Sequence, residues 1–223
     1  LQALYPRQDF KGKRLLVSAG PTREAIDPVR YITNRSSGKM GYALARAAAE
    51  RGAQVTLVSG PVALTSPQGV EVVPVTSSAD MFAAVTARFE ACDALIMAAA
   101  PADFTPARIA EQKIKKQGDG MELSLVNTKD ILAFVGRHKG GRILMGFAAE
   151  SENLAENAQG KLRRKNLDFI AANDITAADA GFGVDTNRVA LYDDGGGARD
   201  SGPMTKEALA DWLLDALAAK MGL

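Results

Sequence analysis

Short apolar runs alternate with segments of helical periodicity along most of the 223-residue chain. The apolar runs predict buried β-strands at residues 14–20, 54–61, 93–100, 142–150 and 167–174. Helical patterns follow at residues 40–53, 78–91, 129–138, 153–166 and 205–222. Because parallel strands need crossover connections, the alternation predicts an α/β fold, a three-layer α/β/α Rossmann-like sandwich with a mostly parallel sheet.

Weaker signals add further elements. Residues 70–75 predict a strand at the sheet edge, since Pro74 cannot donate a hydrogen bond to a neighbouring strand. The alternation at residues 121–126 predicts another strand, and residues 188–194, followed by three glycines, predict a hairpin. Ser78 is the candidate N-cap of the second helix.

The composition, with 47% hydrophobic and 24% charged residues, is that of an ordinary globular protein. Lys and Arg number 27 against 26 Asp and Glu, so the net charge of +1 gives no overall attraction to nucleic acid or to a membrane. Any anion site must therefore be local. The single cysteine, Cys92, excludes an internal disulfide, fits a reducing cytoplasm and is predicted to be buried. No stretch reaches the roughly 18 apolar residues of a membrane span.

Two connections at the carboxyl ends of predicted strands, residues 19–41 and 98–120, are much longer than usual. Ligands of parallel α/β sheets bind at this edge, so both loops are candidate functional segments. The first contains Arg30 and the sequence NRSSGKMG, residues 34–41, which lacks the glycine spacing of a P-loop. Its Ser-Ser-Gly turn opens a helix, whose free N–H groups can bind an anion; a capped helix with a solvated basic turn fits equally well.

The second long loop carries Asp103 and the run KIKK, which begins at Lys113 and is followed by two glycines. We interpret this run as a mobile cationic flap that reaches a phosphate chain, with Asp103 holding Mg²⁺ against the same phosphates. The alternatives are a solvated charge run and an aspartate that caps the loop. Lys161 and Lys165, four residues apart on one helix face, are a second phosphate clamp or an exposed basic face.

Proton shuttling and covalent catalysis have little support in the sequence. The only histidine, His138, closes a predicted helix, where a cation suits the helix dipole. No Ser/His/Asp set, metal-binding Cys/His cluster or carboxylate pair stands out. The residues therefore favour chemistry by charge stabilisation and positioning.

Several segments together resemble phosphopantothenoylcysteine synthetase of the bacterial type. They include DPVRYITNRSSGKMG, AAAPADF, EQKIKK, GFAAE and KLRRKNLDFIAAND, in this order from about residue 13 to the last helix. The resemblance implies one ligase domain over residues 13–223, with residues 1–12 as a linker from an upstream flavin-dependent decarboxylase. It also implies a homodimer, with residues 19–41 contributing to the interface.

The resemblance further implies a reaction of coenzyme A synthesis. CTP and 4'-phosphopantothenate would give an acyl-cytidylate and pyrophosphate, and the amine of L-cysteine would then release CMP. Carried over by position, the catalytic residues are Asn34, Lys113 and Arg30, and Asp103 is the metal ligand. The nucleotide-binding and anion-binding set is Met97, Ala98, Ala99, Asp103, Lys113, Lys129, Asp130, Ile131, Leu132, Phe147, Lys161 and Lys165, with Ser36, Ser37 and Gly38.

Two positions depart from the family pattern. Lys129 stands where the family often has a proline, so its backbone is expected to contribute more than its side chain. Pro101 replaces a common valine two residues before Asp103. Two other function classes share the fold pattern: a Rossmann-type nucleotide-dependent oxidoreductase, which lacks support from a glycine fingerprint, and a non-catalytic nucleotide-binding domain.

Overall fold

The computed structural model describes residues 7–116, 118, 120–150, 153–174 and 185–223. Within these residues, an eight-stranded sheet has the strand order β13-β12-β10-β9-β6-β1-β4-β5. Its parallel part runs from β5 to β10, and β12 and β13 pair antiparallel at the other edge. The strands are β1 (Arg14–Ala19), β4 (Gln54–Ser59), β5 (Val70–Pro74), β6 (Ala94–Met97), β9 (Ile143–Glu150), β10 (Phe169–Asp174), β12 (Ala190–Asp193) and β13 (Ala198–Asp200).

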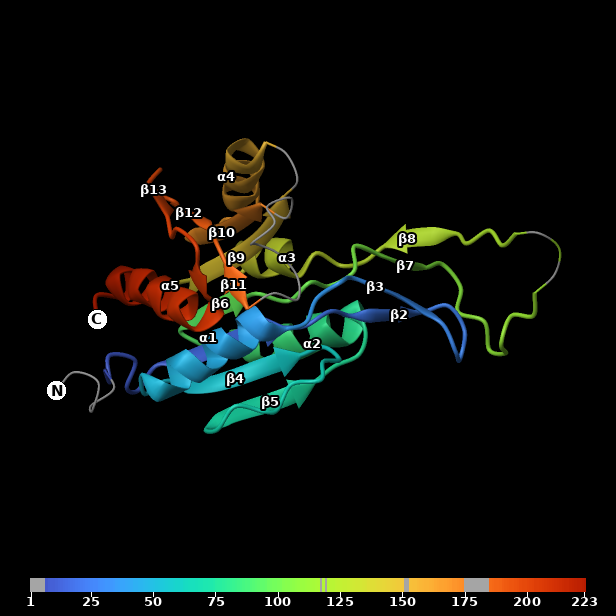
Figure 1. Cartoon of the computed structure of the whole chain (residues 1–223), viewed down its shortest axis with the longest axis horizontal. Helices are drawn as coiled ribbons and strands as arrows, with labels where there is room; N and C mark the ends of the chain where they lie inside the picture. The colour runs from blue at the N-terminus through green and yellow to red at the C-terminus, as the bar shows by residue number, and fades with distance from the viewer. Residues whose placement is uncertain (1–6, 117, 119, 151–152, 175–184) are drawn as a thin grey trace.

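Helices cover both faces of the sheet (Figure 1). One hydrophobic cluster joins the sheet to α1 (Lys39–Glu50) and α5 (Lys206–Met221). A second cluster, on the opposite face, contains side chains of α2 (Ser78–Phe89), α3 (Ile131–Arg137) and α4 (Leu154–Arg164). The predicted three-layer sandwich with a mostly parallel sheet is therefore confirmed.

Burial along the strands follows from their place in the sheet. All four residues of β6 are buried, as expected for a central strand covered on both faces. Strand β5 lies at the edge and ends at Pro74, which confirms the prediction for this segment. Strands β12 and β13 form the predicted hairpin.

The helix ends show how local sequence sets the boundaries. Ser77, and not Ser78, caps α2: its hydroxyl accepts from the N–H of Asp80, whose carboxylate accepts from the N–H of Ser77. Asp130 caps α3 and Thr205 caps α5 in the same way, through the N–H three residues on.

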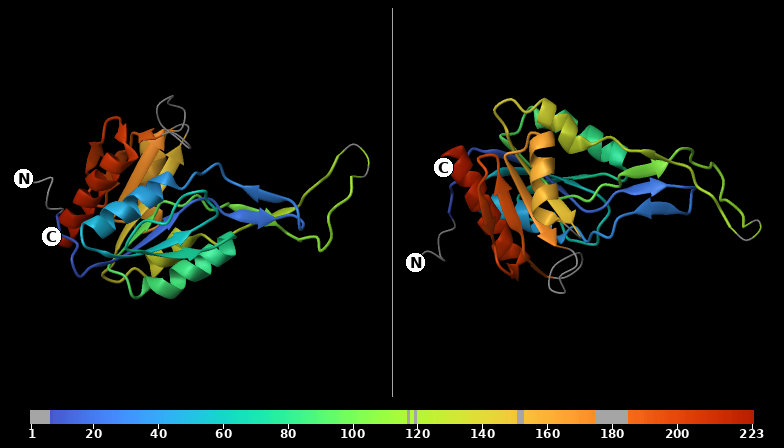
Figure 2. Two further views of the ribbon diagram at one scale, coloured as in Figure 1. Left: turned by 60° about the horizontal axis from the view of Figure 1, so that its bottom comes forward. Right: turned by 90° about the horizontal axis from the view of Figure 1, so that it is seen from above.

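A narrow arm projects from the sandwich (Figures 1 and 2). It consists of two antiparallel pairs, β2 (Arg23–Ala25) with β3 (Tyr31–Thr33) and β7 (Phe104–Pro106) with β8 (Leu125–Asn127). The described residues of 23–33 and 104–127 are called the arm below. The strand expected at residues 121–126 is thus shorter, shifted and outside the main sheet, and the expected flap is the outer part of the arm. A smaller pair joins β11 (Thr186–Asn187) and β14 (Met204–Thr205).

Cys92 is buried, as predicted. Burial raises the pKa of its thiol to about 11, so the group is a weak nucleophile at neutral pH. Among the described residues, no helix is long and apolar enough to cross a membrane.

Candidate functional site

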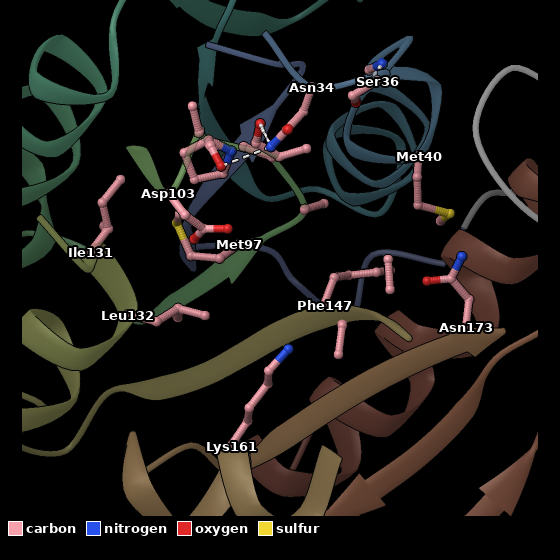
Figure 3. A pocket seen from close by; sticks show the side chains of 18 of the residues that line it. Asn34, Ser36, Met40, Met97, Asp103, Ile131, Leu132, Phe147, Lys161 and Asn173 are labelled. Carbon is pink, nitrogen blue, oxygen red and sulfur yellow. Dashed lines mark hydrogen bonds between the residues drawn. The ribbon is translucent and has the colours of Figure 1, made fainter. Parts of the chain in front are cut away.

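A cavity of about 690 Å³ lies at the carboxyl ends of the parallel strands. Its size is that of a small-molecule site. Fifteen of the residues proposed from sequence line it, and Figure 3 shows side chains from several elements around it. These are Asn34, Ser36, Ser37, Gly38, Met97, Ala98, Ala99, Asp103, Lys129, Asp130, Ile131, Leu132, Phe147, Lys161 and Lys165.

One rim of the cavity is the start of α1. Gly38 is the N-cap residue with φ of 78°, a conformation that suits glycine, and it makes no side-chain capping hydrogen bond. Gly41 lets the helix approach β1 closely, because a Cβ there would lie 2.7 Å from the carbonyl oxygen of Ser18. The first turn of α1 is therefore held against a strand end and lines the cavity, where a helix start favours an anion.

Asn34 ties this rim to the loop after β6. Its Nδ2 donates to the carbonyl oxygens of Ala100 and Pro101 at 3.3 and 3.1 Å (Figure 3). The amide therefore fixes the turn before α1 relative to the segment that leads to Asp103. A substrate oxygen that takes a hydrogen bond from Nδ2 must share or replace these carbonyl partners.

The opposite rim combines α3 and α4. Lys165 Nζ lies 2.8 Å from Asp130 Oδ2, and Asp130 also accepts from the N–H of Ala133. Burial opposes the charge of Asp130, but Lys165 and the helix N–H outweigh it and lower the pKa of the carboxyl. Lys161 extends from α4 into the cavity towards Phe147 (Figure 3). Lys129 Nζ lies 4.9 Å from the ring centroid of Phe82, a cation–π contact that engages its side chain.

Further cavity residues were not in the predicted site set: Lys39 and Met40, which lie in the NRSSGKMG segment, and Asn173, Asn187 and Lys206, which the sequence analysis missed. Lys206 is 5% exposed, and its Nζ donates to the carbonyl oxygen of Thr186. Burial and the charge of Lys39 lower the pKa of Lys206. The one sequence signal was a lysine in the first turn of a helix, where the dipole disfavours a cation.

Arg30 and Lys113 do not line the cavity. Both lie on the arm, where Arg30 Nη1 contacts Asp27 Oδ2 at 2.8 Å and Arg30 Nη2 donates to the carbonyl oxygen of Ile114 at 3.1 Å. The structure therefore brings Arg30 next to the segment that carries Lys113, but neither residue lines the cavity with the other fifteen.

The described residues contain no cluster of three His, Cys, Asp or Glu side chains that would hold a metal ion. Within the described residues of 98–120, Asp103 is the carboxylate that lines the cavity (Figure 3). One such carboxylate fits Mg²⁺ that takes its other ligands from substrate phosphates and water. The ring of His138 stacks on that of Phe134 with 4.5 Å between the ring centroids, and its Nδ1 lies 2.9 Å from the carbonyl oxygen of Phe134. These contacts agree with the position of His138 at the C-terminal end of α3.

Comparisons with known proteins agree along nearly the whole chain. The family model of the DNA/pantothenate metabolism flavoprotein C-terminal domain matches residues 10–221. The chain is 50% identical over 211 residues to the coenzyme A biosynthesis bifunctional protein CoaBC of Bacillus subtilis (strain 168), covering 94% of this chain and 52% of that protein. It is 48% identical over 191 residues to CoaBC of Escherichia coli (strain K12), covering 84% and 47%. The chain thus spans about half the length of the curated relatives it matches.

A solved structure gives the same assignment, and a second one shares the fold. A crystal structure of the C-terminal domain of CoaBC has a TM-score of 0.83 and 40% identity, covering 96% of this chain and 98% of that one. Cab2 in complex with phosphopantothenate-cysteine has a TM-score of 0.74 at 15% identity, covering 98% of this chain and 89% of that one, a likeness of fold alone. The chain belongs to the DNA/pantothenate metabolism flavoprotein C-terminal domain family.

Proposed function

We propose that the chain is a phosphopantothenate–cysteine ligase of coenzyme A biosynthesis that uses CTP. The observation that carries the proposal is the cavity itself, which has lysines and the glycine-capped start of α1 at its rims and small neutral residues between them. Such a site suits two anionic substrates that must meet. The Bacillus subtilis relative is named a coenzyme A biosynthesis protein, which supports the same pathway.

The first step joins the carboxylate of 4'-phosphopantothenate to the α-phosphorus of CTP and releases pyrophosphate. Both reactants are anions, so their approach costs Coulomb energy unless positive groups surround them. Lys161 and Lys165 supply charge from α4, and Lys39 and Lys206 supply it from the opposite side. Fixed charges and N–H groups aimed at the leaving pyrophosphate stabilise the transition state more than the ground state.

Asp103 would hold Mg²⁺ on the phosphates, and that ion would supply further charge neutralisation when bound. On the nucleotide side, the start of α3 and Phe147 would contact the base and ribose of CTP. Because Lys129 contacts Phe82, we assign its nucleotide contact to the backbone. Asn34 would orient the acyl group through its amide, which contributes no charge that would trap the intermediate.

The second step belongs to cysteine. Its amine attacks the acyl carbon, the bond from that carbon to the cytidylate oxygen breaks, and CMP leaves. The nitrogen loses a proton as the amide forms. Small residues in the loop after β6, Ala98 to Ala100, leave room beside the acyl carbon for this approach.

The arm leads us to propose a homodimer. Large apolar side chains exposed on the described residues gather on it: Val29, Tyr31, Phe104, Ile109, Met121, Leu125 and Val126. Pairing of two arms would cover these side chains. Arg30 and Lys113 would then act at the cavity of the partner, since they do not line that of their own chain.

Mixed dimers test this arrangement. Equal amounts of Asn34→Ala and Lys113→Gln chains, unfolded and refolded together, should recover about a quarter of the wild-type rate, because half of the dimers carry one intact site. Refolding each variant alone is the control. A mixture no more active than the two parents would contradict action across the dimer.

The remaining proposals concern the cell. The relatives are named bifunctional, so we propose an upstream decarboxylase partner joined near residues 1–12, and a cytoplasmic location.

The test of function is product analysis by ³¹P NMR. Pyrophosphate should appear only with CTP, Mg²⁺ and 4'-phosphopantothenate together, and CMP only after cysteine is added. Nicotinamide turnover, or nucleotide binding without pyrophosphate, would favour an oxidoreductase or a non-catalytic domain instead.

A further inference from the structure

We propose that Asp27 is a positioning residue for the ligase: it clamps the backbone of the arm beside Lys113 and holds Arg30 in the same clamp. The inference rests on the proposed function for its catalytic consequence. The clamp itself rests on contacts within the described part of the arm and is testable without any reaction.

Asp27 is a buried acid, 3% exposed, on an arm whose described residues are mostly accessible to solvent. Its Oδ1 accepts from the N–H groups of Val29 and Arg30, both at 2.8 Å. Its Oδ2 accepts from Arg30 Nη1 at 2.8 Å and from the N–H of Ile114 at 3.1 Å. One oxygen thus closes the local turn between β2 and β3, while the other reaches across to a segment 87 residues away.

Ile114 is held on both sides of its backbone. Its N–H donates to Asp27, and its carbonyl oxygen accepts from Arg30 Nη2 at 3.1 Å. The same ion pair therefore grips the residue that lies directly between Lys113 and Lys115. A further backbone bond, from the N–H of Ala110 to the carbonyl oxygen of Ile26, joins the same two segments.

A carboxylate suits this position because four donors converge on it. Burial opposes the charge of Asp27, but the three N–H groups and Arg30 outweigh it and lower the pKa of the carboxyl. Asparagine keeps an oxygen for the local turn, yet its NH₂ group would face the N–H of Ile114 and the guanidinium, all of them donors. Asp27→Asn should therefore remove the hydrogen bonds across the arm, to Ile114 and the guanidinium, and keep those of the local turn.

The consequence for catalysis follows from geometry. A lysine that stabilises a leaving phosphate must be held within about 0.5 Å of its working position, and misplacement by about 1 Å costs up to about 100-fold in rate. Because both backbone groups of Ile114 are hydrogen-bonded, the backbone of the adjacent Lys113 is restricted in its movement. We expect Asp27→Asn to slow pyrophosphate release about 10- to 100-fold and to leave the attack of cysteine on preformed acyl-cytidylate much less affected.

A double-mutant cycle provides the kinetic test, with single-turnover pyrophosphate release measured for wild type, Asp27→Asn, Lys113→Gln and the double variant. If Asp27 acts mainly through Lys113, Asp27→Asn should slow Lys113→Gln much less than it slows wild type, because only its effect through Arg30 remains. Rate losses that multiply would overturn the proposal. Asp200→Asn is the matched control, since Asp200 also accepts from an arginine and a backbone N–H, on β13, and should keep the wild-type rate.

Amide hydrogen exchange tests the clamp separately. The N–H of Ile114 should exchange slowly in wild type and at least 10-fold faster in Asp27→Asn, whereas that of Ala133, bonded to Asp130, should be unchanged. Unprotected Ile114 in wild type would overturn the clamp, whatever the activity. If Ile114 is protected but wild type releases no pyrophosphate, the proposed function fails and the clamp stands.

Discussion

Gly41 sets how closely α1 approaches β1, and Gly41→Ala should misplace the helix start at the cavity. An added Cβ would lie 2.6 Å from the Cβ of Ala19 and 2.7 Å from the carbonyl oxygen of Ser18. Ordinary contact begins near 3.4 Å, so the helix must move by about 0.8 Å. Two of the three nearest atoms, Ser18 O and Ala19 Cα, are backbone, so a rotamer change cannot relieve the strain.

The free energy of unfolding follows from two opposing effects. Overpacking typically costs about 1–3 kcal/mol, and a backbone obstacle places this site near the upper end. Replacing a helical glycine by alanine returns about 1 kcal/mol, which leaves a net loss of about 2 kcal/mol. Gly160→Ala in α4 is the matched control: its nearest atom is the tip of Arg164 at 3.4 Å, so it should gain up to about 1 kcal/mol.

Urea unfolding and single-turnover pyrophosphate release measure the two consequences. Gly41→Ala should be about 3 kcal/mol less stable than Gly160→Ala and about 10- to 100-fold slower than wild type, because a shift near 1 Å misplaces the N–H groups at the helix start. Equal stability of the two variants, or a wild-type rate for Gly41→Ala, would refute the tight approach of α1 as the basis of the site.

Three further predictions concern single side chains. Asn34→Ala should lower overall ligation more than CTP-dependent pyrophosphate release; equal loss in both half-reactions would contradict a role at the acyl stage. Because the pKa of Lys206 is lowered, its side chain loses its charge at a lower pH than an ordinary lysine. The KM for CTP should therefore rise at alkaline pH in wild type and stay constant in Lys206→Arg. If the KM of both proteins changes with pH in the same way, Lys206 does not contact the anion. With a pKa of about 11, only about one Cys92 thiol in a thousand is ionised at pH 8. A disulfide reagent should therefore label Cys92 rapidly only when the chain is unfolded in urea. Rapid labelling of the folded chain would contradict the burial of Cys92.

The sandwich was predictable because its signals are local. Buried central strands such as β1 and β6 are continuous apolar runs, and the rule that ligands bind at their carboxyl ends placed both long loops at the site. Residues next to a strand end or helix start, such as Asn34 and Asp103, therefore fell on the cavity. The spacing of Lys161 and Lys165 indicated a phosphate clamp or an exposed basic face, and the family resemblance favoured the clamp and added the residues at the start of α3.

The arm and the contribution of Lys206 to the cavity were not predictable in the same way. Strands β2, β3, β7 and β8 are three residues each, too short for periodicity to reveal their pairing. Lys206 reaches the cavity only because α5 packs beside α1, a contact between distant parts of the sequence. The role of Asp27 depends on a bond to Ile114 that no local pattern encodes.

Oxygen transfer tests the central claim, that a carboxylate attacks the α-phosphorus of CTP, most directly. The chain would be supplied with 4'-phosphopantothenate carrying ¹⁸O in its carboxylate, together with CTP, Mg²⁺ and cysteine, and the products analysed by mass spectrometry. Attack through an acyl-cytidylate predicts one labelled oxygen in CMP and none in pyrophosphate. Unlabelled CMP, or label in inorganic phosphate with release of CDP, would contradict the account.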